Sequence, residues 1–522
     1  MCGIVGYAGN IETACGRPLE VCLQGLERLE YRGYDSAGVA LTEPGMDKVV
    51  VRKKAGRLKN LVEDIERKPM PLATVGIGHT RWATNGEPSD VNAHPHTSMD
   101  GKVAIIHNGI IENASQLRLD LQAEGYRFAS ATDTEVAAKL LGKIVDKIIA
   151  DEGKPDLFKA VRRMARMLEG AFTILATDCR QPDIVVGARH DSPLVVGLGE
   201  GENFLGSDVA AFVAYTKRAM EVDQDQAVCV SADTVIVADF NGNVVENPKT
   251  YTVDWDASAA EKGGWDSFMD KEIHEDPAAV QRTLLGRFDT NGDITLDEVR
   301  IDEHDFKAID KIIVVACGTA SYAGQVAKYA IEHWVRIPVE IELAHEFRYR
   351  DPILTPRTLV VAISQSGETM DTLMALRHAR EQGSKVLAIC NTQGASIPRE
   401  SDAVLYTHAG PEVAVASTKA FVAQITAAYL LGLYLAQVKG AMFRDEIHQV
   451  LDSLKDMPRK IQWVLDTQPK TIQAAAERMV NANSFLFLGR HVGYPVALEG
   501  ALKLKEIAYT FTEGFAAGEL KH

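Results

Sequence analysis

Five short, predominantly apolar runs recur between Lys311 and Tyr406, and they restrict the possible folds more than any other feature of the sequence. The runs are Ile312–Ala316, Val339–Leu343, Thr358–Ile363, Lys385–Cys390 and Ala403–Tyr406. Helical segments separate them. Strands with near-continuous apolar side chains are buried on both faces, as in a parallel sheet that is covered by helices. The sequence therefore predicts a doubly wound α/β fold for this half of the chain.

The pattern of that half repeats later in the chain. Ile312–Glu332 reads as strand, glycine, tyrosine and helix, and Phe485–Glu506 has the same order. Glu342–Phe347 is similarly echoed by Thr510–Phe515. Two copies of one α/β unit are therefore predicted, over residues 304–444 and 476–522. The second copy has room only for its first β-α-β elements, so we expect the sequence as given to be incomplete at its C-terminal end.

The first 245 residues combine short β-rich runs with turns and two amphipathic helix candidates. The runs are Gly3–Tyr7, Val39–Leu41, Ala73–Gly78, Val103–His107, Phe172–Thr177, Ile184–Arg189, Val228–Ser231 and Thr234–Asp239. The helix candidates are Pro18–Leu29 and Asp133–Ile149. Such a mixture predicts an α+β layered domain over residues 2–245. Residues 246–303 are charged, punctuated by glycine and partly helical, and we interpret them as a linker.

Charge and cysteine usage exclude several classes of function. The net charge is −16, whereas nucleic acids and anionic membranes bind basic surfaces, so we expect neither as a partner. The seven cysteines include no Cys-x-x-Cys pair, which argues against a disulfide framework or a zinc site. No signal-peptide pattern is present, and the apolar stretch Val415–Leu435 is interrupted by Lys419 and Gln424. We therefore expect a cytoplasmic protein.

Residues 289–293 imitate a calcium-binding loop, but the glycine lies at the fourth position of the loop instead of the sixth. We predict a polar turn there, and no metal site elsewhere.

Cys2 is the first candidate for catalysis. Removal of Met1 is expected when the second residue is small, and it would make Cys2 the N-terminal residue. A free α-amine, with a pKa of ~8, can then act as general base toward the thiol of the same residue. The thiolate would attack a carboxamide, form a thioester and release ammonia. A cysteine at position two is weak support for this chemistry when taken alone.

Further sequence blocks strengthen that interpretation. They are Cys2-Gly3-Ile4-Val5-Gly6, Tyr31-Arg32-Gly33-Tyr34-Asp35-Ser36-Ala37-Gly38, Gly78-His79-Thr80-Arg81-Trp82-Ala83-Thr84, His107-Asn108-Gly109-Ile110-Ile111-Glu112-Asn113 and Asp133-Thr134-Glu135. In this order they resemble the class II glutamine amidotransferases, whose N-terminal-nucleophile fold has αββα layers. The resemblance covers most of residues 2–245.

The chemistry of glutamine hydrolysis suggests roles for these blocks. A tetrahedral oxyanion needs fixed donors, which the Asn108 amide and the Gly109 N–H would supply; a type I′ hairpin turn is the other interpretation of Asn-Gly. The guanidinium of Arg81 would bind the α-carboxylate of glutamine. The carboxylate of Asp133 would bind its α-ammonium, and an N-cap for the following helix is the competing interpretation.

The resemblance also implies that Thr84 lies near the amino-acid end of glutamine and that Trp82 is a movable gate between two sites. A buried core tryptophan is the alternative for Trp82. Asn85 departs from the family, in which histidine is often found at this position.

The hydroxyl-rich segment Ser364-Gln365-Ser366-Gly367-Glu368-Thr369 follows an apolar strand and opens the predicted helix Met370–Arg380. Backbone N–H groups at a helix N-terminus bind phosphate, and open α/β sheets bind ligands at the carboxyl ends of their strands. Ser364, Gln365, Ser366 and Thr369 are therefore predicted to bind phosphate; helix capping would explain one hydroxyl but not three. Neither a Walker A motif nor a complete Gly-x-Gly-x-x-Gly is present.

The second half resembles tandem sugar-isomerase (SIS) domains. The matching motifs are Cys317-Gly318-Thr319-Ala320-Ser321, the Ser364–Thr369 loop, Val415-Ala416-Ser417-Thr418-Lys419, Glu499-Gly500-Ala501-Leu502-Lys503-Leu504-Lys505-Glu506 and Gly518-Glu519-Leu520-Lys521-His522. Ala320 stands where some relatives have serine.

This resemblance implies that Thr319, Val415 and Ser417 contact the sugar. Glu506, assisted by Lys503, would move a proton between C1 and C2. His522 would help to open the sugar ring, donated by a neighbouring subunit of a homodimer. From the residues alone, Lys503 and Glu506 could equally be an i,i+3 ion pair on a helix surface, and His522 could be a mere chain end.

Together the two resemblances imply transfer of the amide nitrogen of L-glutamine to D-fructose 6-phosphate with isomerisation. The products would be D-glucosamine 6-phosphate and L-glutamate, and no cofactor is needed. The family also requires a Schiff-base lysine and a tail that seals an ammonia channel, which we expect beyond His522. Alternatives are a glutaminase-only or sugar-phosphate-sensing fragment. Phosphoribosyl-transferring and asparagine-synthetase relatives need a pyrophosphate-binding or an ATP-binding loop, and neither loop is found.

Overall fold

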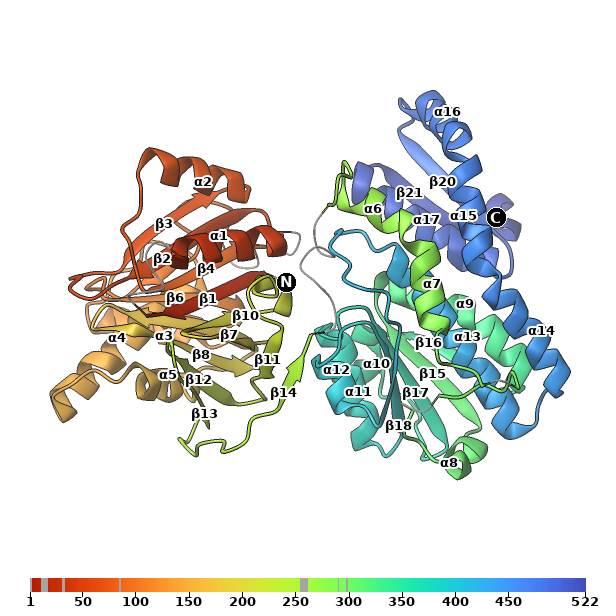
Figure 1. Ribbon diagram of the computed structural model, residues 1–522, viewed down its shortest axis with the longest axis horizontal. Helices are drawn as coiled ribbons and strands as arrows, with labels where there is room; N and C mark the ends of the chain where they lie inside the picture. The colour runs from red at the N-terminus through yellow and green to blue at the C-terminus, as the bar shows by residue number, and fades with distance from the viewer. Residues whose placement is uncertain are drawn as a thin grey trace. The chain divides into compact units, whose positions relative to one another are not determined.

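The chain folds as two units, Met1–Glu261 and Lys262–His522, shown in Figure 1. The computed structural model describes residues 2–10, 17–30, 33–83, 86–253, 262–289, 291–296 and 299–522. Each unit has its own hydrophobic core, so each is described by itself.

The first unit is built on two antiparallel sheets. In sheet order, the larger contains β14 (Thr250–Thr252), β11 (Arg218–Glu221), β9 (Val195–Leu198), β10 (Glu202–Gly206), β1 (Gly3–Gly9), β4 (Val75–Arg81), β2 (Ser36–Thr42) and β3 (Val50–Ala55). The other contains β13 (Val235–Asp239), β12 (Gln226–Val230), β8 (Gln181–His190), β7 (Phe172–Asp178), β6 (Val103–Gly109) and β5 (His96–Thr97).

Alternation along the strands packs the two sheets face to face. Ile4 and Ile77 of the larger sheet share one buried cluster with Ala104 and Ile106 of the other. The opposite face of the larger sheet is covered by α1 (Arg17–Leu29) and α2 (Leu58–Arg67). The outer face of the second sheet is covered by α3 (Ala114–Ala123), α4 (Asp133–Glu152) and α5 (Leu157–Ala165). These αββα layers confirm the predicted fold of this unit.

The second unit contains an all-parallel sheet. Its strands, in sheet order, are β16 (Val339–Leu343), β15 (Lys311–Ala316), β17 (Thr358–Ser364), β18 (Lys385–Cys390) and β19 (Ala403–Tyr406). They coincide with the five apolar runs of the sequence, so the predicted doubly wound fold is confirmed.

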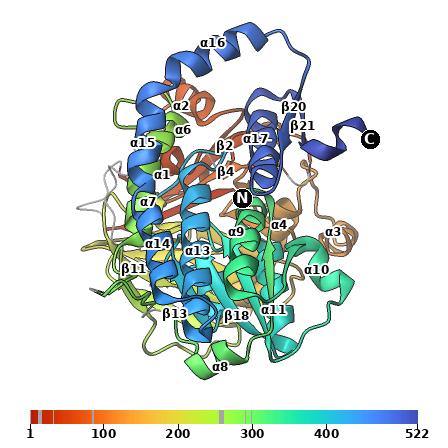
Figure 2. The same cartoon turned by 90° about the vertical axis from the view of Figure 1, so that its right-hand side faces the viewer.

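Helices cover both faces of this sheet. One face packs against α9 (Gly318–Val335) and α13 (Lys419–Lys439), which lie side by side in Figure 2. The other face packs against α10 (Ala344–Arg350), α11 (Met370–Glu381) and α12 (Ser396–Glu400). α13 is long and apolar enough to cross a membrane, but most of it is buried in this core.

Residues 262–303 of the predicted linker lie in the second unit. They include α6 (Phe268–His274) and α7 (Asp276–Leu284), and α7 packs against α13. The short helix α8 (Glu303–Ala308) leads into β15.

The rest of this unit follows α13. Its elements are α14 (Arg444–Lys455), α15 (Met457–Thr467), α16 (Pro469–Met479), β20 (Ser484–Gly489), α17 (Gly493–Ala508) and β21 (Phe511–Ala516). β20 and β21 pair in parallel, as expected of a β-α-β unit, and α17 packs against α9.

Candidate active sites

Cys2 lies immediately before β1, where the chain meets the end of β4. Its Sγ accepts a hydrogen bond from the backbone N–H of Trp82 at 3.2 Å. Its carbonyl oxygen accepts one from Asn108 Nδ2 at 2.8 Å. The structure therefore brings together three predicted residues that are far apart in sequence. Burial raises the pKa of the Cys2 thiol, so this nucleophile needs a base to become a thiolate.

Asn108 and Gly109 form the end of β6 and pair with Thr173 and Phe172 of β7. They are not the turn of a hairpin, so the turn interpretation of Asn-Gly is wrong. Gly109 has φ +118°, and a Cβ at this position would collide with the carbonyl oxygen of Ala171. Only glycine fits there.

Asp133 is the first residue of α4 and is buried. Its Oδ2 accepts from the backbone N–H of Ile111 at 3.0 Å, so the carboxylate lies beside the chain that follows Gly109. The N-cap of α4 is Thr132, whose side chain accepts from the N–H of Glu135. The N-cap interpretation of Asp133 is therefore wrong, and its carboxylate belongs to the site region.

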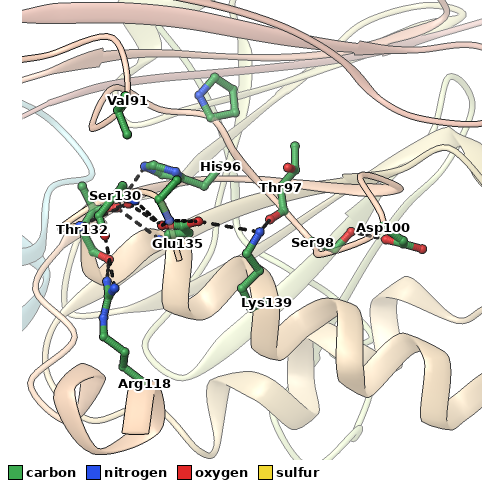
Figure 3. A network of polar contacts seen from close by, with 12 residues as sticks. Val91, His96, Thr97, Ser98, Asp100, Arg118, Ser130, Thr132, Glu135 and Lys139 are labelled. Carbon is green, nitrogen blue, oxygen red and sulfur yellow. Dashed lines mark hydrogen bonds and ion pairs between the residues drawn. The ribbon is translucent and has the colours of Figure 1, made fainter. Parts of the chain in front are cut away.

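A polar network holds the turn that precedes Asp133 (Figure 3). Glu135 accepts hydrogen bonds from the backbone N–H of Ser130 at 2.7 Å and from its hydroxyl at 2.8 Å. Arg118 donates to the carbonyl oxygens of Ser130 and Thr132. Lys139 pairs with Glu135 at 3.7 Å and donates to the carbonyl of Thr97. The first turn of α4 is thus fixed by charged groups.

A cavity of about 710 Å³ borders this network, and its lining includes Lys53, Glu135 and Lys139. Lys53 Nζ donates to the carbonyl oxygens of Val91, Ala93 and Pro95, and burial lowers its pKa to about 8. This lysine therefore holds the segment 91–95 in place. Of the residues predicted to bind glutamine, the three that the structure describes, Arg81, Trp82 and Asp133, do not line this cavity.

Arg81 ends β4, is buried, and donates from Nη2 to the carbonyl of Gly86 at 3.0 Å. Trp82 is 47% exposed and its ring meets the edge of Tyr34, with 5.3 Å between ring centroids. The core interpretation of Trp82 is therefore wrong. Thr84 and Asn85 lie outside the described residues.

Four buried histidines lie near one another, and one of them, His79, contacts Asn108; sequence reasoning assigned them no role. The rings of His79, His96 and His107 lie 4.3 to 6.4 Å from the ring of His94. Burial lowers the pKa of all four, so they are neutral at physiological pH. His107 Nδ1 lies 3.0 Å from the hydroxyl of Thr134, beside Asp133.

In the second unit, the predicted sugar residues lie at a topological switch point. The sheet order places β16 on one side of β15 and β17 on the other, so the connections leave β15 and β17 in opposite directions. Thr319 follows β15, and Ser364 ends β17. Ligands of open α/β sheets bind at such a point.

The Ser364–Thr369 segment forms a tight turn between β17 and α11. Ser364 Oγ accepts from the N–H of Gly367 at 3.1 Å and lies 3.0 Å from Thr369 Oγ1. Ser366 Oγ accepts from the N–H of Glu368 at 3.2 Å. Thr369 occupies the N-cap position of α11 but makes no side-chain cap hydrogen bond. Capping therefore does not account for these hydroxyls.

Lys503 of α17 reaches the first turn of α9, which follows β15. Its Nζ donates to Thr319 Oγ1 at 3.1 Å and pairs with Glu506 at 2.7 Å and Glu499 at 3.4 Å. The i,i+3 pair is thus real, but it is joined to the predicted sugar loop. Sequence reasoning gave Glu499 no role; it is buried, and burial raises its pKa.

Val415 and Ser417 lie on the loop between β19 and α13. Val415 is exposed, and Ser417 Oγ donates to Glu412 at 2.8 Å. Behind this loop, Glu272 of α6 accepts from the N–H groups of Val413 and Ala414. α6 therefore holds the loop in place.

His522 is exposed and its backbone N–H donates to the carbonyl of Glu519. Among the described residues, the structure does not bring it into contact with the other predicted sugar residues.

Comparison with known proteins agrees with this two-part architecture. A family model described as glutamine amidotransferase domain matches residues 79–214, and one described as SIS domain matches residues 306–434.

Full-length relatives cover the whole chain. It is 62% identical over 523 residues to the glutamine–fructose-6-phosphate aminotransferase [isomerizing] of Corynebacterium efficiens, which is 100% of this chain and 83% of that protein. The protein of the same name from Streptomyces coelicolor is 58% identical over 522 residues, covering 100% and 82%. Among solved structures, the C-terminal domain of glucosamine-fructose-6-phosphate aminotransferase from Francisella tularensis is 40% identical, with a TM-score of 0.49 over 50% of this chain and 73% of that one.

Proposed function

The chain belongs to the isomerizing glutamine–fructose-6-phosphate aminotransferases, and we propose how its two sites divide the work of that reaction. The enzyme transfers the amide nitrogen of L-glutamine to D-fructose 6-phosphate with isomerisation, and forms D-glucosamine 6-phosphate and L-glutamate. Ammonia is released in the first unit and used in the second. The isomerisation oxidises C1 and reduces C2 of the same sugar and needs no external oxidant or reductant, so we propose that no cofactor takes part.

In the first unit Cys2 is the nucleophile. Once Met1 is removed, the α-amine of Cys2 accepts the thiol proton, and Sγ attacks the glutamine carboxamide. The amide N–H of Asn108 and the backbone N–H of Gly109 stabilise the tetrahedral oxyanion. Collapse expels ammonia and leaves a thioester, which water hydrolyses to glutamate.

The charged ends of glutamine bind to residues around this centre. Arg81 binds the α-carboxylate and Asp133 the α-ammonium; each is buried, so each charge pair would be shielded from water. Thr84 lies near the same end. Exposed Trp82, whose backbone N–H bonds Cys2 Sγ, gates the passage of ammonia.

In the second unit the phosphate is bound by the hydroxyls of Ser364, Ser366 and Thr369, the Gln365 amide and the N-terminus of α11. The sugar is contacted by Thr319, in the first turn of α9, and by Val415 and Ser417 on the loop after β19.

Isomerisation is carried out by Glu506 and Lys503, near the end of α17. Glu506 moves a proton between C1 and C2, and Lys503 assists, since it links Glu506 to Thr319. His522 of a neighbouring subunit aids ring opening.

We propose that the protein is cytoplasmic and forms a homodimer. Light scattering of the purified protein tests the dimer, and a monomer at all concentrations would contradict it.

The glutaminase assignment rests on one observation: Cys2 accepts hydrogen bonds from both Trp82 and Asn108. Cys2→Ala should abolish glutamine hydrolysis, because no second group in this arrangement combines thiol and amine. Binding of fructose 6-phosphate, measured by calorimetry, should be unchanged. Hydrolysis that survives in purified Cys2→Ala protein would remove Cys2 from the mechanism.

A further inference from the structure

Asn108 and His79 face each other across the interior of the first unit. Side chains alternate along β4, so His79 points to the same side as the core residue Ile77. On β6, Asn108 points to the same side as Ile106, which belongs to the same core cluster. The two sheets therefore bring His79 Nε2 to 3.0 Å from Asn108 Oδ1.

The backbone carbonyl of Cys2 decides which atom donates the hydrogen in the contact between His79 and Asn108. The backbone carbonyl of Cys2 accepts hydrogen bonds and cannot donate them. Because it lies 2.8 Å from the side-chain nitrogen of Asn108, that end of the amide must be the NH₂ group. Asn108 Oδ1 then faces His79, and His79 must carry its hydrogen on Nε2.

We propose that His79 is a positioning residue for glutamine hydrolysis: it locks the side-chain amide of Asn108 in the one orientation in which the NH₂ faces the oxyanion. The NH₂ has two hydrogens. One is donated to the Cys2 carbonyl, and the hydrogen bond from His79 keeps the other directed toward the oxyanion. This inference rests on the proposed function, in which Asn108 is an oxyanion donor.

The surroundings of His79 keep its ring fixed. The ring is fully buried and packs on His94, with 4.3 Å between ring centroids. Gly38 pairs with His79 in the sheet, and a Cβ on Gly38 would collide with the carbonyl oxygen of His94. Glycine at position 38 therefore lets the segment with His94 close over His79. Burial lowers the pKa of His79 to about 3, so the ring stays neutral and keeps a single N–H.

Without the His79 N–H, only the Cys2 carbonyl favours this orientation of the amide. The flipped amide, which offers no donor to the oxyanion, then becomes more populated. Loss of the lock therefore acts on the transition state and leaves glutamine binding nearly intact. His79→Phe keeps a flat ring but removes the N–H, and should lower kcat for glutamine hydrolysis by about 10–100-fold with KM within about threefold. His79→Gln restores a donor and should recover kcat to within about fivefold of wild type. His304→Phe, at an exposed position of α8, is the matched control and should change neither constant.

A double-mutant cycle separates this role from a general structural one. In an Asn108→Ala background there is no amide to orient, so His79→Phe should cost less than about twofold in kcat. An equal loss of kcat in both backgrounds, or a rise in KM alone, would overturn the proposal. Failure of the proposed function looks different, since hydrolysis would then survive Cys2→Ala.

If His79→Phe does not fold, the hydrogen position in the unmodified protein decides. Neutron diffraction of deuterated protein should show deuterium on Nε2 of His79 and none on Nδ1. Deuterium on Nδ1 with Nε2 bare would overturn the proposal.

Discussion

The proposed glutamine site and the proposed sugar-phosphate site differ in what holds their polar groups in place. In the first unit, the side-chain amide of Asn108 bonds both the backbone carbonyl of Cys2 and the ring of His79, and the buried contact with His79 joins the two sheets. In the second unit, backbone hydrogen bonds join the proposed phosphate loop to its neighbours: the N–H of Asn391 donates to the carbonyl of Gln365, and that of Ile397 to the carbonyl of Gly367. Within the loop, the hydroxyls of Ser364 and Ser366 accept from backbone N–H groups.

The buried ionisable groups differ as well. Burial lowers the pKa of the histidines around Asn108, so these rings do not titrate near neutral pH. Behind the Val415 loop, burial raises the pKa of Glu272 and Asp276 to about 7. The buried histidines of the first unit should thus keep one protonation state near neutral pH, whereas the carboxyl groups behind the Val415 loop should change theirs.

The largest expected effect tests side-chain identity at the first site. Asn108→Ala removes one fixed donor from the oxyanion and should lower kcat for glutamine hydrolysis by about 10²–10³-fold, with less effect on KM. Steady-state kinetics measure both constants. Asn60→Ala, on the surface of α2, is the control and should behave like wild type. A raised KM with unchanged kcat would make Asn108 a binding residue and would break the comparison.

The next effect tests whether the carboxyl group of Asp276, behind the Val415 loop, titrates near neutral pH. Burial raises the pKa of Asp276 from 3.8 to about 7, so between these values the folded protein binds more protons than the unfolded chain. The free energy of unfolding therefore falls as pH rises through this window. Asp276→Asn stays neutral, and its stability relative to wild type should grow by about 1–2 kcal/mol from pH 5.5 to pH 8.

Urea unfolding of both proteins at the two pH values measures this difference. Asp466→Asn, at an exposed position of α15, controls for loss of a charge. A difference that is constant with pH would show that Asp276 does not titrate in this range, and the contrast with the first site would be lost.

The two regions also differ in how well the sequence predicted them. All five strands of the parallel sheet were predicted, because strands buried on both faces must be apolar. In the first unit six strands were not predicted: β3, β5, β9, β10, β11 and β14. One of them, β3, is an edge strand and carries Arg52, Lys53 and Lys54. The structure explains the lysine at position 53, since its ammonium group satisfies three backbone carbonyls, a contact that no periodicity reveals.

The same limit applies to the sites. Cys2, Asn108 and Asp133 could be proposed as site residues because each stands in a short sequence motif. His79 stands inside one of those motifs, but its role depends on a partner in another sheet, 29 positions away. Glu272 lies 141 residues from the N–H group it binds and belongs to no motif. Long-range pairing of single polar groups is the information that one sequence does not carry.

A smaller effect tests whether backbone groups dominate at the second site. Ser366→Ala removes one hydroxyl from the phosphate loop, but the N–H groups of the turn and of α11 remain. The Kd for fructose 6-phosphate should rise only about 3–10-fold, equivalent to roughly 1 kcal/mol. Calorimetry measures the change, and Ser453→Ala on α14 is the control. A loss above about 100-fold would mean that side chains dominate here too.

The smallest effect concerns the support of Asp133, where the first site depends on a local cap. Thr132 Oγ1 accepts from the N–H of Glu135 at 3.3 Å and lies 3.0 Å from His96 Nε2. Thr132→Ala leaves that N–H without its cap and should lower the free energy of unfolding by about 1 kcal/mol. Because Glu135, Ser130 and Arg118 still hold the turn, Asp133 should keep its place and KM for glutamine should change less than about twofold. Thr467→Ala, whose exposed hydroxyl bonds within α15, controls for loss of a threonine. A several-fold rise in KM with little loss of stability would show that the cap, and not the charged network, positions Asp133.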